Sequence, residues 1–188
     1  MEQFVFSNIT WGFVGIQLIG FVGLLLNVVS YQNNTNKRIV GFLLVACFFW
    51  TVHFILLAQL PNNSAAYTAV ALNVIGILRN FVFFMRPKAW AEHHAWLYVF
   101  LLCAVLCGIF VWNGPLTLLP TIAMLFSTVA LYIINPKFTR RLAVGSSVCW
   151  LVFDGLTLSV PGVICETFSL VSIAIAMIRF DRKKTATV

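Results

Sequence analysis

Long apolar stretches make up nearly the whole chain, and very little polar sequence separates them. A helix that crosses a membrane needs about 20 mostly apolar residues. Only 9% of the 188 residues are charged and 61% are hydrophobic, whereas about a quarter of the residues in a soluble domain are charged. We therefore expect an all-α integral membrane protein with a single membrane domain over residues 1–188. The predicted helices cover residues 11–31, 38–60, 65–85, 96–112, 116–134, 142–160 and 161–180.

The number of spans rests on how the last two stretches are interpreted. They meet at Pro161 with hardly a loop. About seven transmembrane helices are expected, and a re-entrant pair remains the alternative for residues 142–180.

The positive charges predict the orientation of the chain. Of the 12 Lys and Arg residues, all except Arg79 lie in the loops after the first, third and fifth stretches or in the C-terminal region. Lys and Arg are enriched on the cytoplasmic side of membrane proteins. We therefore expect the N-terminus outside and a basic cytoplasmic tail at residues 181–188. The net charge of +7 is explained in the same way, so nucleic-acid binding is not expected.

An internal repeat is indicated by two offsets along the chain. A shift of 100 residues places Trp50 on Trp150, and a shift of 93 places Asn73 on Glu166. Two three-helix units joined by one extra helix would have the same orientation in the membrane, as parallel repeats do. The predicted 3+1+3 arrangement comprises a first bundle at 11–86, a linker helix at 96–112 and a second bundle at 116–180.

Several polar side chains lie within the apolar stretches. A charged group at the centre of a transmembrane helix costs about 2.5–3.5 kcal/mol and commonly marks a functional site. At a rise of about 1.5 Å per residue, His53, Asp154 and Glu166 could share one cavity that leans toward the outer side, with Trp50 and Trp150 as its walls. The candidate substrate-binding residues are Asn27, Trp50, His53, Asn73, Trp150, Asp154 and Glu166.

Each of these residues also has a structural interpretation. Asn, Ser and Thr side chains often join transmembrane helices by hydrogen bonds, and buried tryptophans can simply fill a core. Arg79 is expected to extend its side chain toward the cytoplasmic headgroups.

Metal, cofactor and enzyme chemistry have little support in the sequence. All five cysteines lie in apolar stretches, and no CxxC motif occurs, so we expect buried thiols and no metal site or cofactor. His53, Asp154 and Glu166 have the side-chain types used in acid–base catalysis, but no nucleophile motif accompanies them. We therefore do not expect an enzyme, and a channel is less favoured still.

Three segments resemble a known family. They are the run from Asn73 to Asn80, the Phe49-Trp50-x-x-His53 pattern and the run from Gly162 to Glu166. In order and spacing they resemble the YgjV-type bacterial inner-membrane proteins over nearly the whole chain, from about residue 11 to 181. That resemblance implies a location in the inner membrane and no specific activity.

The 3+1+3 arrangement also resembles the SWEET and PQ-loop group of small-solute carriers. That resemblance implies a central pocket between the two bundles. Asn73 matches an asparagine that contacts the solute in sugar carriers, Glu166 stands at the corresponding position of the seventh helix, and Trp150 matches a mid-membrane tryptophan. The Pro-Gln pair and the hinge prolines of those carriers are absent, and two acidic residues are added. These departures favour a cation, an amine or a proton over a neutral sugar.

The predicted function is therefore a multi-pass inner-membrane carrier of a small solute, working by alternating access. A receptor or scaffold that does not transport is the alternative on the same fold. The expected partners are the lipid bilayer and a small-molecule solute, and assembly into a homo-oligomer is left open.

Overall fold

The computed structural model describes residues 11–31, 36–86, 88–133 and 136–178. Every regular element in these ranges is helical, so the all-α prediction is confirmed. A 3-10 turn, η2 (Pro115–Thr117), precedes α6. The α-helices are α1 (Trp11–Tyr31), α2 (Asn36–Leu57), α3 (Ala66–Phe84), α4 (Ala89–Glu92), α5 (Ala95–Phe110), α6 (Leu118–Tyr132), α7 (Pro136–Leu156) and α8 (Val160–Ala176).

Four helical segments within the described ranges are long and apolar enough to cross a membrane. They cover residues 12–30, 40–57, 66–84 and 115–132. Helices α5 and α8 are apolar but shorter, at 16 and 17 residues. Helix α7 has 21 residues, but its first turns carry Lys137, Arg140 and Arg141. By length and hydropathy the structure supports a membrane protein, and the seven-span count stays a prediction.

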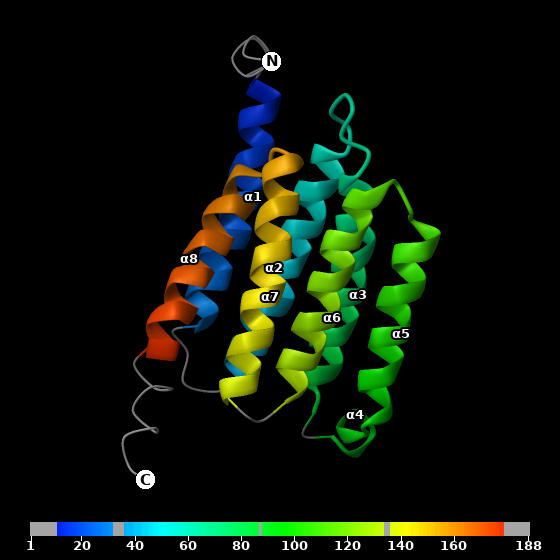
Figure 1. The fold of residues 1–188 in the computed structure, drawn as a ribbon, viewed down its shortest axis with the longest axis vertical. Helices are drawn as coiled ribbons and strands as arrows, with labels where there is room; N and C mark the ends of the chain where they lie inside the picture. Colours follow the sequence, from blue (N-terminus) through cyan, green and yellow to red (C-terminus); the bar gives the residue numbers. More distant parts are fainter. Residues whose placement is uncertain (1–10, 32–35, 87, 134–135, 179–188) are drawn as a thin grey trace.

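Six of the long helices form two facing rows of three (Figure 1). One row is α1, α2 and α3, with α2 in the middle, and the other is α8, α7 and α6, with α7 in the middle. The rows meet where α1 packs on α8 and where α3 packs on α6. Helix α5 packs outside this group, against α3 and α6. The space between the rows is therefore where the interior of the protein lies.

One helix boundary and one additional helix differ most from the expected arrangement. Helix α7 begins at Pro136 rather than at residue 142. Proline is well tolerated in the first helical turn, where its missing N–H is not needed, so the basic stretch that follows is helical rather than loop. The short helix α4 also lies in the expected polar loop between residues 86 and 95. Helices α7 and α8 are two separate helices joined at residues 157–159.

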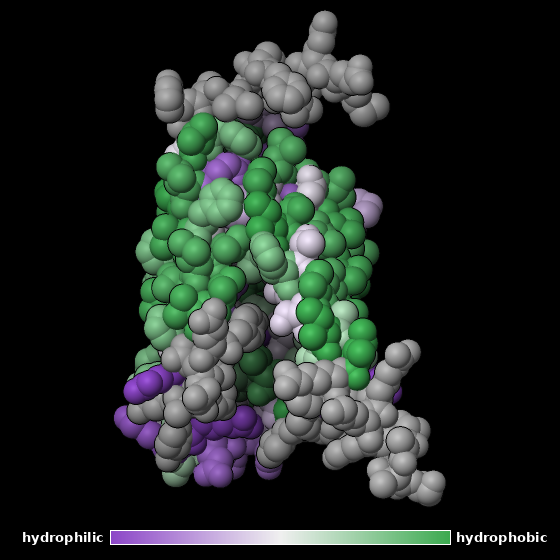
Figure 2. Space-filling view, turned by 90° about the vertical axis from the view of Figure 1, so that its left-hand side faces the viewer, coloured by the Kyte–Doolittle hydropathy of each residue, from purple (hydrophilic) through white to green (hydrophobic). Residues whose placement is uncertain are grey.

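The described basic residues gather at one end of the bundle, except for Arg79. This basic end consists of Arg38 at the start of α2, Arg86 and Lys88 after α3, and Lys137, Arg140 and Arg141 at the start of α7. Figure 2 shows hydrophilic residues at this lower end beneath a broad hydrophobic surface. Large apolar side chains such as Leu25, Phe48 and Phe168 are more than half exposed on the protein, as expected for contact with lipid. Which side of the membrane the basic end faces stays a prediction.

Candidate functional site

Aromatic rings join the two rows of helices across the interior. Phe54 of α2 stacks on Trp50 and on Trp150 of α7, with ring centroids 6.2 Å apart in both pairs. Phe153 of α7 contacts Phe54 at 6.1 Å and Trp150 at 5.8 Å. We call Trp50, Phe54, Trp150 and Phe153 the aromatic stack. The structure thus brings the two predicted tryptophans together through Phe54, a residue that the sequence did not single out.

His53 lies directly beside this stack and is fully buried. Its Nδ1 lies 2.9 Å from the carbonyl oxygen of Ile16 on α1, and its Nε2 lies 2.9 Å from the hydroxyl oxygen of Ser159. Gly20 of α1 makes room for the ring, since a Cβ there would lie 2.8 Å from Nδ1. His53 therefore links α1 and α2 to the start of α8.

Two further polar side chains hold the turn between α7 and α8. Gln17 of α1 donates from Nε2 to the carbonyl of Leu158 at 3.1 Å and accepts from the N–H of Val160 at 3.1 Å. Asn63 donates to the carbonyl of Thr157 at 2.9 Å. Leu158 has φ of 60°, a left-handed conformation that costs a non-glycine residue about 1–2 kcal/mol. These contacts compensate for that cost, and with the His53–Ser159 bond they form what we call the turn latch.

Asp154 lies beneath the latched turn, near the end of α7. Its side chain is 3% exposed, and its Oδ1 is buried with no hydrogen-bond partner among the described residues. The carboxyl group packs against the first turn of α8, where a Cβ on Gly162 would lie 2.5 Å from Oδ2. A buried acceptor without a partner costs about 1–3 kcal/mol, so this carboxyl group is the main polar anomaly of the interior.

Glu166 follows one turn further along α8 and is partly buried. It interacts with the side chain of Ser147 on α7, and it lies close enough to Asp154 for the two carboxylates to repel each other. Asn27 of α1 donates to the sulfur of Cys165, the neighbour of Glu166, at 3.5 Å. Asn27, Asp154 and Glu166 therefore belong to one polar region between α1, α7 and α8.

Asn73 is separate from that region. Its Nδ2 donates to the carbonyl of Ala69 one turn earlier on α3, at 2.9 Å. Gly76 follows on the same face of α3, and a Cβ there would lie 3.5 Å from Met124 of α6. Asn73 thus belongs to the α3 side of the interior, and no described contact joins it to Asp154 or Glu166.

Arg79 is buried, whereas its position in the sequence predicts a side chain that reaches the headgroups. It is 6% exposed, and it donates to Ser127 and Thr128 of α6 at 2.9 Å each and to Asn80 at 3.3 Å. Asn80 in turn donates to the sulfur of Cys47 on α2 at 3.4 Å. Burial of a charged arginine is normally costly, but hydrogen bonds to hydroxyl and amide oxygens lower the free-energy cost here. The guanidinium group therefore fastens α3 to α6.

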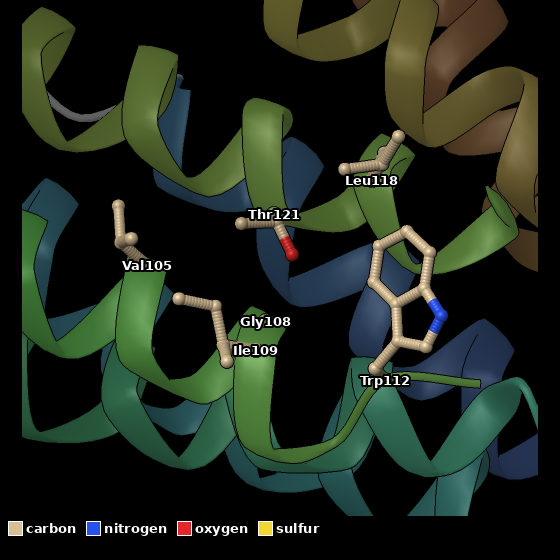
Figure 3. Close-up of a pocket in the computed structure, with 6 residues that line it drawn as sticks. All are labelled: Val105, Gly108, Ile109, Trp112, Leu118 and Thr121. Carbon is tan, nitrogen blue, oxygen red and sulfur yellow. The ribbon is translucent and has the colours of Figure 1, made fainter. Parts of the chain in front are cut away.

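Neither of two pockets on the protein is lined by a predicted site residue. The smaller is a cavity of about 140 Å³ between α5 and α6 (Figure 3). Thr121 provides the only side-chain oxygen among its lining residues, and the indole of Trp112 stands at one end. The larger pocket, of about 430 Å³, lies near the basic end. Asp154 is buried in this conformation, whereas Glu166 is only partly buried.

The residues that hold the site together were only partly visible in the sequence. Gln17, Asn63 and Ser159 were not singled out, although Gln17 is a polar residue inside the first apolar stretch, which was an available signal. Ser159 and Asn63 stand outside the helices, where polar residues are common. The sequence therefore does not distinguish them as residues of the site. Among the described residues, no group of three His, Cys, Asp or Glu side chains is placed to hold a metal ion.

Comparisons with known proteins agree with a location in a bacterial membrane. The profile of a family described as a bacterial inner membrane protein, Imp-YgjV, matches residues 14–184. The chain is 24% identical over 166 residues to the inner membrane protein YgjV of Escherichia coli strain K12, covering 88% of this chain and 84% of that protein. No solved structure is significantly similar to the chain. The resemblance to SWEET and PQ-loop carriers therefore stays a prediction.

Proposed function

The chain belongs to the YgjV family of bacterial inner membrane proteins, and from that premise we propose that it is a small-solute carrier whose site holds a proton or a cation. The observation that carries the proposal is the buried, unpartnered Oδ1 of Asp154 beside a second carboxylate, Glu166. No Lys or Arg in the described ranges forms an ion pair with either group. Two neighbouring carboxylates in a membrane need a compensating positive charge, which a proton or a cationic solute would supply.

The arrangement of helices supports a carrier over a static protein. Each row consists of three helices joined in sequence, and α1 packs on α8 as α6 packs on α3. If the two rows are exchanged, the contact between α1 and α8 takes the place of the contact between α6 and α3. This is expected for parallel repeats related by an axis along the membrane normal. In such carriers the two units rock against each other around a site between them.

The turn latch is a suitable gate on the side opposite the basic end. It covers Asp154 and depends on side chains from α1, α2 and the α2–α3 loop. Movement of one row against the other would break these bonds together and expose the carboxyl group. The aromatic stack would separate in the same movement.

The test is solute-driven proton movement in liposomes that contain the purified full chain and an enclosed pH-sensitive dye. The panel consists of organic cations and amines, neutral sugars, and organic anions. We expect a cation or amine gradient to move protons, and we expect Asp154→Asn and Glu166→Gln to abolish that movement. Glu92→Gln is the matched control, since Glu92 is an exposed carboxylate at the end of α4.

Two results would contradict the proposal. One is an absence of both proton movement and uptake of radiolabelled solute with every panel member, in liposomes whose protein is monodisperse and folded. The other is movement that Asp154→Asn and Glu166→Gln leave at the level of the unchanged chain.

A receptor or scaffold on the same fold is the second candidate, and the aromatic stack favours it. The four rings fill the space between α2 and α7 in this conformation. A panel member that raises the melting temperature but is not taken up and moves no protons would identify a receptor, because a ligand bound to the folded state stabilises it. If no panel member produces either effect, the scaffold is favoured.

A further inference from the structure

An apolar groove runs along α2 at the basic end. It has a volume of about 430 Å³ and is lined by Leu26 of α1, by Arg38, Gly41, Phe42 and Val45 of α2, and by Phe84 of α3. Arg38 is the only polar side chain among these six residues. Residues spaced three and four apart lie on one face of a helix, so the four α2 residues form a continuous floor.

Small residues on α2 keep the groove open. Gly41 has no side chain, and a Cβ there would lie 3.3 Å from Cε2 of Phe84. Val45 is 47% exposed, so the groove opens on the surface of the protein rather than into its interior. In a membrane protein such a surface faces lipid.

Arg38 stands at the end of this groove nearest the start of α2. Its side chain is exposed, and it forms no ion pair with another described residue. Val45 lies seven residues further along the helix, about 10 Å deeper at the usual helical rise. The groove therefore presents one cation at its outer end and an apolar floor below, which matches a phosphate group followed by an acyl chain.

We propose that this groove is a binding site for an anionic phospholipid, with the phosphate on Arg38 and an acyl chain along Gly41 to Val45. Arginine binds phosphate with two parallel hydrogen bonds, and basic residues at a membrane surface attract anionic lipids. The site lies on α2 at the opposite end of the helix from His53, so it does not depend on the proposed carrier function.

The test compares lipid binding by native mass spectrometry of the full chain, purified in detergent and stripped of lipid. The probes are phosphatidylglycerol and phosphatidylcholine with identical acyl chains, and glycerol phosphate as a soluble headgroup. We expect the chain to prefer phosphatidylglycerol, and we expect Arg38→Gln to weaken that binding about fivefold, the effect of one basic residue near an anionic surface. Val45→Trp should weaken both lipids, since its ring would occupy the groove.

Lys88→Gln is the matched control, because Lys88 is an exposed cation at the same end that does not line the groove. It should bind phosphatidylglycerol as the unchanged chain does. If Lys88→Gln and Arg38→Gln weaken phosphatidylglycerol binding equally, the proposal is overturned, and the lipid is instead attracted by the overall charge of the basic end. Binding of glycerol phosphate as tight as that of phosphatidylglycerol would overturn the acyl-chain site, and so would undiminished lipid binding in Val45→Trp.

Discussion

Gly162 fixes where the carboxyl group of Asp154 can lie. A Cβ at this position would stand 2.4 Å from Cγ of Asp154 and 2.6 Å from the hydroxyl oxygen of Ser159. Real Cβ atoms do not approach other atoms so closely, so the absence of a side chain at residue 162 lets α8 begin against the carboxyl group.

We predict that Gly162→Ala lowers the melting temperature of the protein in detergent. The added methyl group would overpack the contact between α7 and α8, which costs about 1–3 kcal/mol. Gly155→Ala is the control on α7, where a Cβ would meet nothing within 4 Å. Alanine is preferred over glycine inside a helix by about 0.5–1 kcal/mol, so this control should melt at the same temperature or higher. Equal melting of the two variants would show that Gly162 is not a tight contact.

Among the elements, the turn between α7 and α8 depends most on distant partners. Gln17, His53 and Asn63 come from α1, α2 and the α2–α3 loop, and they bond the turn at three successive residues from Thr157 to Ser159. The turn itself contains the left-handed Leu158. Local backbone bonds also close the turn, from the N–H of Thr157 to the carbonyl of Phe153 and from the N–H of Ser159 to the carbonyl of Asp154, both at 2.9 Å, so the distant side chains add to a turn that the end of α7 already forms.

We predict that Gln17→Leu loosens this turn without unfolding the bundle. Leucine cannot bond the Leu158 carbonyl or the Val160 N–H, so both groups lose a partner at a cost of about 1–3 kcal/mol each. Amide hydrogen exchange should become faster at residues 157–163 and stay unchanged in α5 and α6. Gln59→Leu is the control, since Gln59 is exposed and its side-chain amide donates to the hydroxyl of Tyr67. Faster exchange throughout the chain would instead mean that Gln17 supports the whole fold.

The same elements show what a sequence can and cannot predict. Apart from α7, the helix bounds lie within a few residues of those expected, because they depend on local breakers, such as the Pro61-Asn62-Asn63 turn after α2, and on the length of each apolar stretch. The partners of Gln17 stand 141 and 143 residues away along the chain, and no local pattern encodes such a distance. Asn73 was grouped with Glu166 by sequence alignment of the halves, but equivalent positions in two repeats need not be neighbours in space.

In the whole molecule, the aromatic stack is the contact between the middle helices of the two rows, α2 and α7. Phe54 is 2% exposed and touches Trp50 and His53 of its own row and Trp150 and Phe153 of the other. The rows also meet at the edges, where α1 packs on α8 and α3 packs on α6, and at the turn latch. Phe54 is therefore the side chain on which the association of α2 with α7 most depends.

We predict that Phe54→Ala both destabilises the protein and lets the rows separate. Removing a buried phenylalanine ring costs about 3–5 kcal/mol, so the melting temperature should fall. Cys165 is 6% exposed and belongs to the same buried cluster as Phe54. A membrane-permeant thiol reagent should therefore label Cys165 faster in the variant, as measured by mass spectrometry of its peptides below the melting temperature.

Phe48→Ala is the matched control on α2, because Phe48 is 54% exposed and faces away from the stack. It should leave the labelling of Cys165 unchanged. Cys103, already exposed on α5, serves as an internal reference and should react at the same rate in every variant. If Phe54→Ala accelerates labelling at Cys165 and not at Cys103, the rows move apart as units, which is the motion that alternating access requires. Unchanged labelling at Cys165 despite a lower melting temperature would mean that the edge contacts hold the rows together, and would favour the scaffold over the carrier.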